Sequence, residues 1–277
     1  MGRLYVSGRS EERDRADDMQ RLANPTRFMA LSGGLLPWLW SAAVGMLAIG
    51  LYNAFVISPP DYQQGETVRI MYIHVPSAWL AMMSYGVVAL SSFGFLVFRH
   101  PLADVSAKAA VPIGAVFTFL ALVTGSLWGK PMWGTYWVWD ARLTSVLILF
   151  FMFLGLMALR GAIDDEILAA RLTAVLGLVG VIILPVIKFS VDWWYTLHQP
   201  ASVVRMGGPA LHSSILVPLL IMAAAFTLLF VCLHLSAMRN EIRRRRVRVL
   251  RQLAAARAQG GSQDGESTGL VAPEPAR

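Results

Sequence analysis

The chain has 277 residues, of which 56% are hydrophobic and 15% charged, whereas a soluble domain of this length carries about 25% charged residues. This composition excludes an ordinary soluble protein and indicates an integral membrane protein. The net charge of +7 is no argument for nucleic-acid binding, because basic residues gathered at one membrane face give the same excess. The single cysteine, Cys232, excludes a disulfide within the chain and a CxxCH attachment site for c-type haem.

Six apolar runs, each close to the length that crosses a bilayer, follow one another along the chain: 37–57, 78–98, 109–127, 143–159, 172–187 and 213–235. The fifth is expected to continue to about Tyr195, with Pro185 producing a kink. The sequence therefore predicts an all-α fold, a bundle of six transmembrane helices over residues 36–238. A polar segment, 1–35, is expected before it. A basic helix, 240–256, and a disordered tail from Gly260 are expected after it, within 239–277.

Basic residues predict the orientation of this bundle. Nineteen of the 24 Lys and Arg residues fall in the two terminal segments and in the connections after the second and fourth runs, and five fall on the other face. Lys and Arg accumulate on the cytoplasmic side, so both termini are expected in the cytoplasm. The arginine run 243–246 fits a simple topology anchor, and binding to anionic lipid is the alternative.

An aromatic stretch, residues 128–142, lies between the third and fourth runs and so on the outer face. Seven of the nine tryptophans lie at or beyond this outer boundary, whereas interfacial tryptophans usually occupy both faces. Such a density of large flat side chains suits a shelf for a large flat ligand. The alternative is that Trp133 and Trp137, four positions apart, anchor a short amphipathic helix among the headgroups.

Two histidines on the same outer face complete a pattern typical of iron porphyrin. His74 precedes the second run and His198 follows the fifth, and neutral imidazoles are axial ligands of haem iron. Cations are available for the propionates, namely Arg69, Lys130, Arg142 and Arg205. Each residue also has a simpler reading: Asp140 as a helix cap with Arg142 as its partner, His212 as a cap of the sixth run, and His100 and His234 as incidental residues of the inner side.

The stretch from Trp128 to Arg142, with the flanking segments 71–76 and 193–200, resembles the WWD haem-handling proteins. Within them it is most similar to the CcmC family, six-span proteins of bacterial cytochrome c maturation. The resemblance covers about residues 36–235 and leaves both ends unmatched. One departure is Tyr136, where the family often has tryptophan, but tyrosine still offers an aromatic face.

The resemblance implies a haem-handling assembly factor rather than an enzyme. Such a protein binds haem b transiently at the periplasmic surface of the bacterial inner membrane, between axial ligands that map onto His74 and His198. The residues implied in supporting the haem are Trp128, Trp133, Tyr136, Trp137, Trp139, Asp140 and Arg142. The implied partners are the lipid bilayer, the membrane-anchored haem chaperone CcmE, the ATP-binding-cassette subunits CcmA and CcmB, and the small membrane protein CcmD.

Two other classes of protein fit the chain less well. A b-type haem electron-transfer protein typically holds two haems between paired histidines inside the bilayer, and only His234 lies within an apolar run. A solute permease favours broken helices and polar residues at the membrane midplane, and these runs have little of either.

Overall fold

The structure is a bundle of long helices. The computed structural model describes residues 24–199, 202–203 and 205–267, and within these residues it contains no strand. Six helical segments are long and apolar enough to cross a membrane: Pro25–Ile57, Glu66–Phe98, Pro101–Trp133, Ala141–Ala162, Glu166–Trp193 and Ser213–Ala256. The predicted all-α fold with six spans is confirmed, and the chain is a multi-pass membrane protein.

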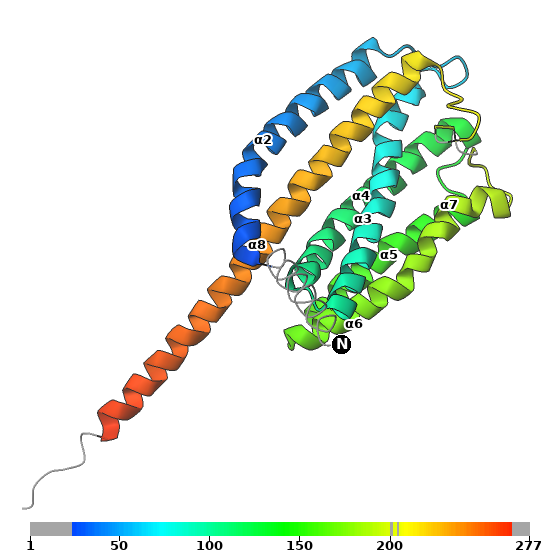
Figure 1. Ribbon diagram of the computed structural model, residues 1–277. Coiled ribbons are helices and arrows are strands. Elements are labelled where there is room, and N and C mark those ends of the chain that lie inside the picture. The colour runs from blue at the N-terminus through cyan, green and yellow to red at the C-terminus, as the bar shows by residue number, and fades with distance from the viewer. Residues whose placement is uncertain (1–23, 200–201, 204, 268–277) are drawn as a thin grey trace, which may run out of the picture. The chain divides into compact units, whose positions relative to one another are not determined.

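Successive spans run in opposite directions (Figure 1). The helices in chain order are α2 (Pro25–Tyr52), η1 (Asn53–Ile57), η2 (Glu66–Ile70), α3 (Met71–Phe98), α4 (Pro101–Trp133), α5 (Ala141–Ala162), α6 (Glu166–Val179), η3 (Gly180–Ile182), α7 (Ile183–Trp193) and α8 (Ser213–Ser267). Consequently α3, α5 and α8 begin, and α4 and α7 end, at the same end of the bundle. We call it the tryptophan-rich end.

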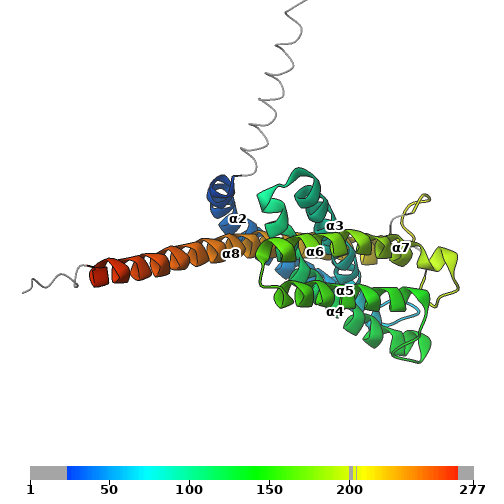
Figure 2. The same ribbon diagram turned by 90° about the horizontal axis from the view of Figure 1, so that it is seen from below.

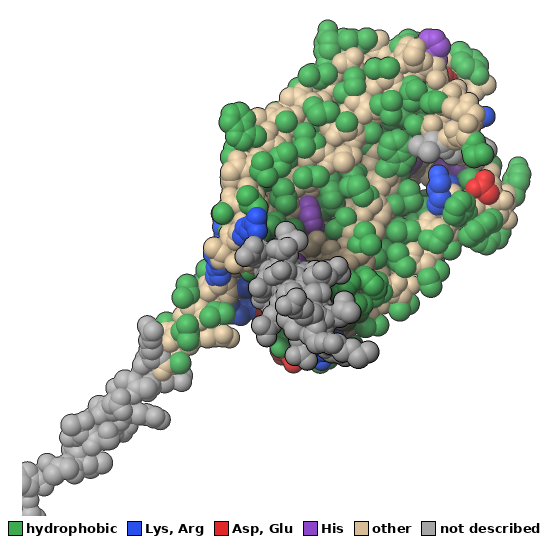
Figure 3. Space-filling model, viewed as in Figure 1, with side chains coloured by type: hydrophobic (Ala, Val, Ile, Leu, Met, Phe, Trp, Pro, Cys, Tyr) green, Lys and Arg blue, Asp and Glu red, His purple; other side chains and the backbone are tan. Residues whose placement is uncertain are grey.

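The packing between helices leaves an apolar outer wall. Helix α3 packs against α4 and α6, and α5 packs against α4 and α7, an arrangement that Figure 2 shows from below. Hydrophobic side chains cover the middle of the bundle in Figure 3. On α2, for example, Leu35 and Trp38 are exposed. An apolar surface this extensive is foreign to a monomeric soluble protein and is what lipid tails require.

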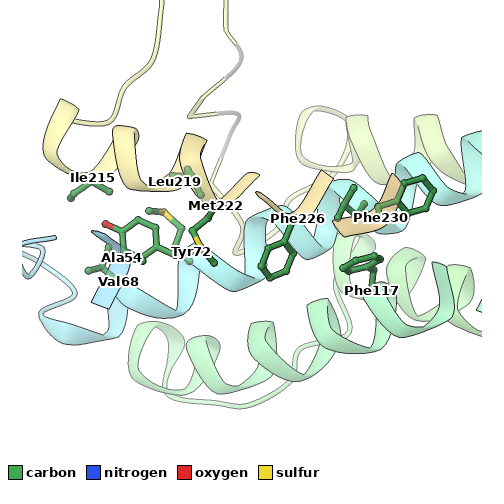
Figure 4. Packing of buried hydrophobic residues seen from close by; sticks show 11 residues of the cluster. Ala54, Val68, Tyr72, Phe117, Ile215, Leu219, Met222, Phe226 and Phe230 are labelled. Carbon is green, nitrogen blue, oxygen red and sulfur yellow. The ribbon is translucent and has the colours of Figure 1, made fainter. Parts of the chain in front are cut away.

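One apolar cluster joins α8 to the hairpin of α3 and α4 (Figure 4). Tyr72 of α3, Phe117 of α4, and Leu219 and Met222 of α8 are all buried in it. Cys232 of α8 is fully buried as well, as expected of a small apolar residue. This cluster places the first turns of α3 and α8 side by side at the tryptophan-rich end.

A second close contact fixes α5 against the same hairpin. A Cβ atom on Gly114 of α4 would lie 2.3 Å from Cζ of Phe153 on α5 and 2.9 Å from Cβ of Ser84 on α3. Only glycine therefore permits this approach of the three helices. The start of α5, which carries Asp140 and Arg142, is thereby positioned relative to the start of α3.

The helices are longer than the apolar runs from which they were predicted. Helix α3 begins at Met71, so His74 lies in its first turn rather than in the expected loop. Helix α4 continues to Trp133, so the first part of the aromatic stretch 128–142 is helical. Gly134 ends it in the left-handed conformation (φ 77°), which glycine adopts without strain. No helix spans Trp133 and Trp137, so the proposed amphipathic anchor is wrong.

The fifth span is bent, as expected. A single 3-10 turn, Gly180–Ile182, separates α6 from α7 just before Pro185. Proline lacks the N–H that would pair with the carbonyl of Val181, and such a gap interrupts an α-helix. The span ends at Trp193, close to the predicted Tyr195.

The chain ends differ in part from expectation. Helix α2 begins at Pro25, inside the predicted polar segment 1–35, and residues 1–23 lie outside the described part. The basic stretch 240–256 is helical, and α8 is described as far as Ser267, past Gly260, where the tail was expected to begin; residues 268–277 lie outside the description. By its contacts the chain forms two compact units, Met1–Met238 and Arg239–Arg277.

Candidate haem site at the tryptophan-rich end

His74 is held in one orientation by α4. Its Nδ1 atom lies 3.0 Å from the carbonyl oxygen of Ala121 and 3.1 Å from Oγ1 of Thr124. Because a carbonyl can only accept, Nδ1 carries the proton and donates it. The Thr124 hydroxyl donates to the carbonyl of Leu120 at 2.6 Å, which leaves its lone pairs to accept from His74. The lone pair of the neutral ring is therefore on Nε2, where a metal would bind.

The same ring fits against a glycine and a tryptophan. A Cβ atom on Gly125 would lie 2.8 Å from Cε1 of His74, so this position on α4 has no room for a side chain. The imidazole also meets Trp128 edge-on, with ring centroids 5.6 Å apart. Trp128 is itself fixed, because its Nε1 donates to Oε1 of Gln64 at 3.0 Å. Trp128 therefore supports His74 in this structure.

His198 lies beyond the end of α7, in a segment without regular secondary structure. Its ring meets Trp133 edge-on, with centroids 4.9 Å apart. Its Nδ1 lies 3.6 Å from Oδ2 of Asp140, which is too long for a hydrogen bond. Neither atom has a hydrogen-bond partner among the described residues, although both are buried. A small movement would pair them.

The surroundings of His198 favour its neutral form. Burial lowers the pKa of this imidazole, and although the carboxylate of Asp140 raises it, the guanidinium of Arg142 lowers it again. The net direction is down from the ordinary value of 6.5. A neutral imidazole keeps the lone pair that iron needs.

Asp140 and Arg142 fix the start of α5. Oδ1 of Asp140 accepts from the backbone N–H of Leu143 at 2.7 Å, so Asp140 caps the helix as its simpler reading predicted. Arg142 does not pair with it by hydrogen bonds. Its Nε donates to Oγ of Ser190 at 2.9 Å and its Nη2 to the carbonyl of Lys188 at 3.3 Å, which ties α5 to α7.

The rest of the aromatic stretch folds back over α4. Oγ of Ser126 donates to the carbonyl of Tyr136 at 2.8 Å. Trp137 and Trp139 meet edge-on at 5.5 Å, and Trp139 is 74% exposed. Tyr136 is exposed too, with the ammonium group of Lys130 5.3 Å above its ring centroid. The stretch therefore combines half-buried rings, of which Trp133 lies beside His198, with rings that are exposed.

The arrangement suits a porphyrin better than a bare metal ion. No group of three or more His, Cys, Asp or Glu side chains that could hold a metal occurs in the described part of the chain. A metal centre built from side chains alone normally has at least three such ligands. Two imidazoles beside aromatic rings match haem, whose macrocycle supplies the other four nitrogens.

The four cations expected near the propionates differ in how far other groups already engage them. Arg69 is engaged by Glu66, 2.7 Å away, and by the carbonyl of Phe55. Arg142 holds α7, and Lys130 covers Tyr136 and reaches the carbonyl of Gly134 at 3.0 Å. Arg205 is exposed. His212 lies at this end as well and caps α8, because Nδ1 accepts from the backbone N–H of Ser214 at 3.3 Å.

Sequence reasoning missed the residues that hold His74 and Arg142. Ala121, Thr124 and Gly125, which hold His74, lie in the third apolar run, about 50 positions from it, and Ser190, which holds Arg142, lies just past the fifth run. The only hint was the small polar triplet 124–126 close to the end of an otherwise apolar run.

Comparison with known proteins identifies the family of this chain. The family model described as heme exporter protein C (CcmC) matches residues 18–253. The chain is 68% identical over 244 residues to heme exporter protein C of Bradyrhizobium diazoefficiens, covering 88% of this chain and 92% of that protein. It is 47% identical over 225 residues to heme exporter protein C of Escherichia coli K12, covering 81% and 90%. It is 45% identical over 205 residues to a putative cytochrome c biosynthesis ccmC-like mitochondrial protein of Marchantia polymorpha, covering 74% and 87%. The chain thus belongs to the heme exporter protein C family.

Proposed function

We propose that this protein handles haem in cytochrome c maturation by binding haem b between His74 and His198. The observation that carries the proposal is the pair of histidines at the tryptophan-rich end. The proton of His74 is fixed on Nδ1 by Ala121, and Nδ1 of His198 is turned toward Asp140. Both rings therefore keep Nε2 for iron. A hydrogen bond from the ring nitrogen that does not bind the metal, here Nδ1, is the usual way in which proteins orient a histidine ligand.

The protein then acts as an assembly factor and not as an enzyme. It delivers haem to the chaperone CcmE, with CcmA, CcmB and CcmD acting alongside. The exposed rings of Tyr136 and Trp139 support this part of the proposal, because aromatic side chains are enriched where proteins meet. The two imidazoles orient the iron while the haem supplies the chemistry of its own attachment.

The orientation we propose puts the tryptophan-rich end in the periplasm and both termini in the cytoplasm, with the protein in the bacterial inner membrane. The support is the distribution of Lys and Arg, nineteen against five. Reporter fusions after Ser106 and Asp164 should read cytoplasmic, and fusions after Tyr62, Gly134 and Ser202 should read periplasmic. A periplasmic reading after Ser106 would reverse the bundle and remove the site from the periplasm.

The test of haem binding is spectroscopic. The purified protein should bind one haem with a low-spin bis-imidazole spectrum. The single changes His74→Gly and His198→Gly should weaken retention, and added imidazole should partly restore the spectrum. His212→Gly is the matched control, because His212 lies at the same end but caps α8. If the double change at His74 and His198 leaves the spectrum intact, the ligands are elsewhere. A stable haem that never passes to CcmE would instead favour an electron-transfer protein.

A further inference from the structure

The two candidate ligands are supported very unequally. His74 lies in the first turn of α3 and donates from Nδ1 to acceptors on α4, at 3.0 Å from Ala121 and 3.1 Å from Thr124. Both acceptors belong to a helix that packs along α3 through the bundle. Moving this imidazole would break hydrogen bonds in an apolar environment, where a polar group without a partner is costly.

In addition to these hydrogen bonds, Gly125 allows the ring of His74 to pack closely against α4. Its missing side chain is what lets the ring lie against α4, since a Cβ atom would come within 2.8 Å of Cε1 and 3.3 Å of Nδ1. With Trp128 also against it, at 5.6 Å between centroids, the ring is confined. The imidazole is therefore already oriented before haem arrives.

His198 has none of this support. It lies outside the helices and its Nδ1 stops 3.6 Å short of Asp140, without a hydrogen-bond partner in the described part of the chain. Within the described part of the chain, the ring contact of His198 is the edge of Trp133. No hydrogen bond from that part of the chain holds Nδ1 of His198, so the iron has to supply the restraint that α4 supplies for His74.

We infer that His74 is the permanent ligand of the haem iron and that His198 is the ligand exchanged when haem leaves, with Ala121, Thr124 and Gly125 as positioning residues. The inference rests on the proposed function and adds an order of events to it. In the exchange the bond from iron to Nε2 of His198 breaks, its electron pair returns to the imidazole, and a neutral lone-pair donor of the acceptor bonds in its place. The iron keeps its oxidation state and no proton moves.

The experiment compares the loss of each candidate ligand, His74 or His198, in the purified full-length protein loaded with haem. Without added imidazole, His198→Gly should retain a haem held by one histidine, and His74→Gly should retain about 10-fold less, the loss typical when the support of a metal ligand is removed. Transfer of haem to apomyoglobin should be accelerated by His198→Gly. Equal losses from the two variants, or the reverse order, would overturn the inference. Unchanged spectra in both would instead overturn the proposed ligand pair.

The positioning residues give a second, independent measurement. Thr124→Val removes an acceptor at nearly constant shape and should speed haem transfer about 10-fold and shift the low-spin electron paramagnetic resonance signal, while Thr124→Ser should restore both. Gly125→Ala should do the same. Gly86→Ala on α3 is its control, because a Cβ atom there meets nothing within 4 Å. If Thr124→Val and Gly125→Ala insert normally and behave like Gly86→Ala, His74 is not the fixed ligand.

Discussion

Asp140 has two oxygens that do different things, and substitutions can separate them. Oδ1 caps α5 through Leu143, and Oδ2 faces Nδ1 of His198 from 3.6 Å. Asparagine caps a helix about as well as aspartate, so Asp140→Asn should leave stability nearly unchanged, while Asp140→Ala should cost about 1 kcal/mol through the lost cap. Both changes remove the negative charge beside His198.

The size of the effect on haem follows from the same geometry. A charge-assisted hydrogen bond is roughly 2.7–2.9 Å long, so the gap must close by nearly 1 Å when His198 binds iron. Losing a carboxylate partner of a metal-bound histidine costs about 10–100-fold in affinity. Because this pair must first move together, we expect the lower end, about 10-fold or 1.4 kcal/mol.

Thermal unfolding in detergent and haem titration measure the two effects on the same samples. Asp192→Asn serves as the control, since it removes an exposed carboxylate from α7 at the same end of the bundle. The reasoning fails if Asp140→Asn binds haem like the unaltered protein, because the carboxylate would then be only a cap. It also fails if Asp140→Asn unfolds as early as Asp140→Ala.

Three further outcomes are expected. Single changes to alanine at Trp133, Trp137 and Trp139 should reduce chaperone loading, measured as covalent haem on CcmE, more than they reduce the protein level in the membrane. Equal reductions of loading and protein level would indicate that these tryptophans only anchor the protein. Because burial lowers the pKa of His198, the ring stays neutral below 6.5, so the bis-imidazole spectrum should persist as the pH falls through that value and disappear only at a lower pH; loss at 6.5 or above would contradict the assigned environment. Truncation after Gly260 combined with His100→Ala and His234→Ala should leave the haem absorption bands intact, since a span of about 20 residues, roughly 30 Å, separates the inner side from the site; their loss in a variant that inserts normally would place the haem elsewhere.

The number and kind of the helices could be predicted because an apolar run of spanning length rarely forms anything but a membrane helix. Their ends could not. Hydropathy falls where a helix leaves the hydrocarbon, but the backbone continues: α4 runs six residues past the predicted 127, to Trp133. The second run was predicted from 78, yet α3 begins at Met71 and contains Pro76, because proline is tolerated in membrane helices.

In the site, too, some residues could be predicted from the sequence and others could not. His74, His198 and the aromatic stretch stand out in the sequence because histidine and clustered tryptophan are unusual beside apolar runs. Thr124 and Gly125 do not, since small residues are ordinary in membrane helices. Their role depends on how α3 and α4 align, which single-sequence patterns do not encode. Asp140 was expected as a site residue or a cap; the structure shows the cap, and the other carboxylate oxygen lies 3.6 Å from Nδ1 of His198.

The exposure of Trp139, at 74%, has a consequence for how tightly a chaperone needs to bind. In the proposed delivery both proteins are fixed in one membrane, so they meet by diffusion in two dimensions. Confinement to one membrane raises the effective concentration of each protein for the other. An aromatic surface that is too weak to hold a partner in solution can then be occupied for much of the time, and it lets the partner go once the haem has been transferred.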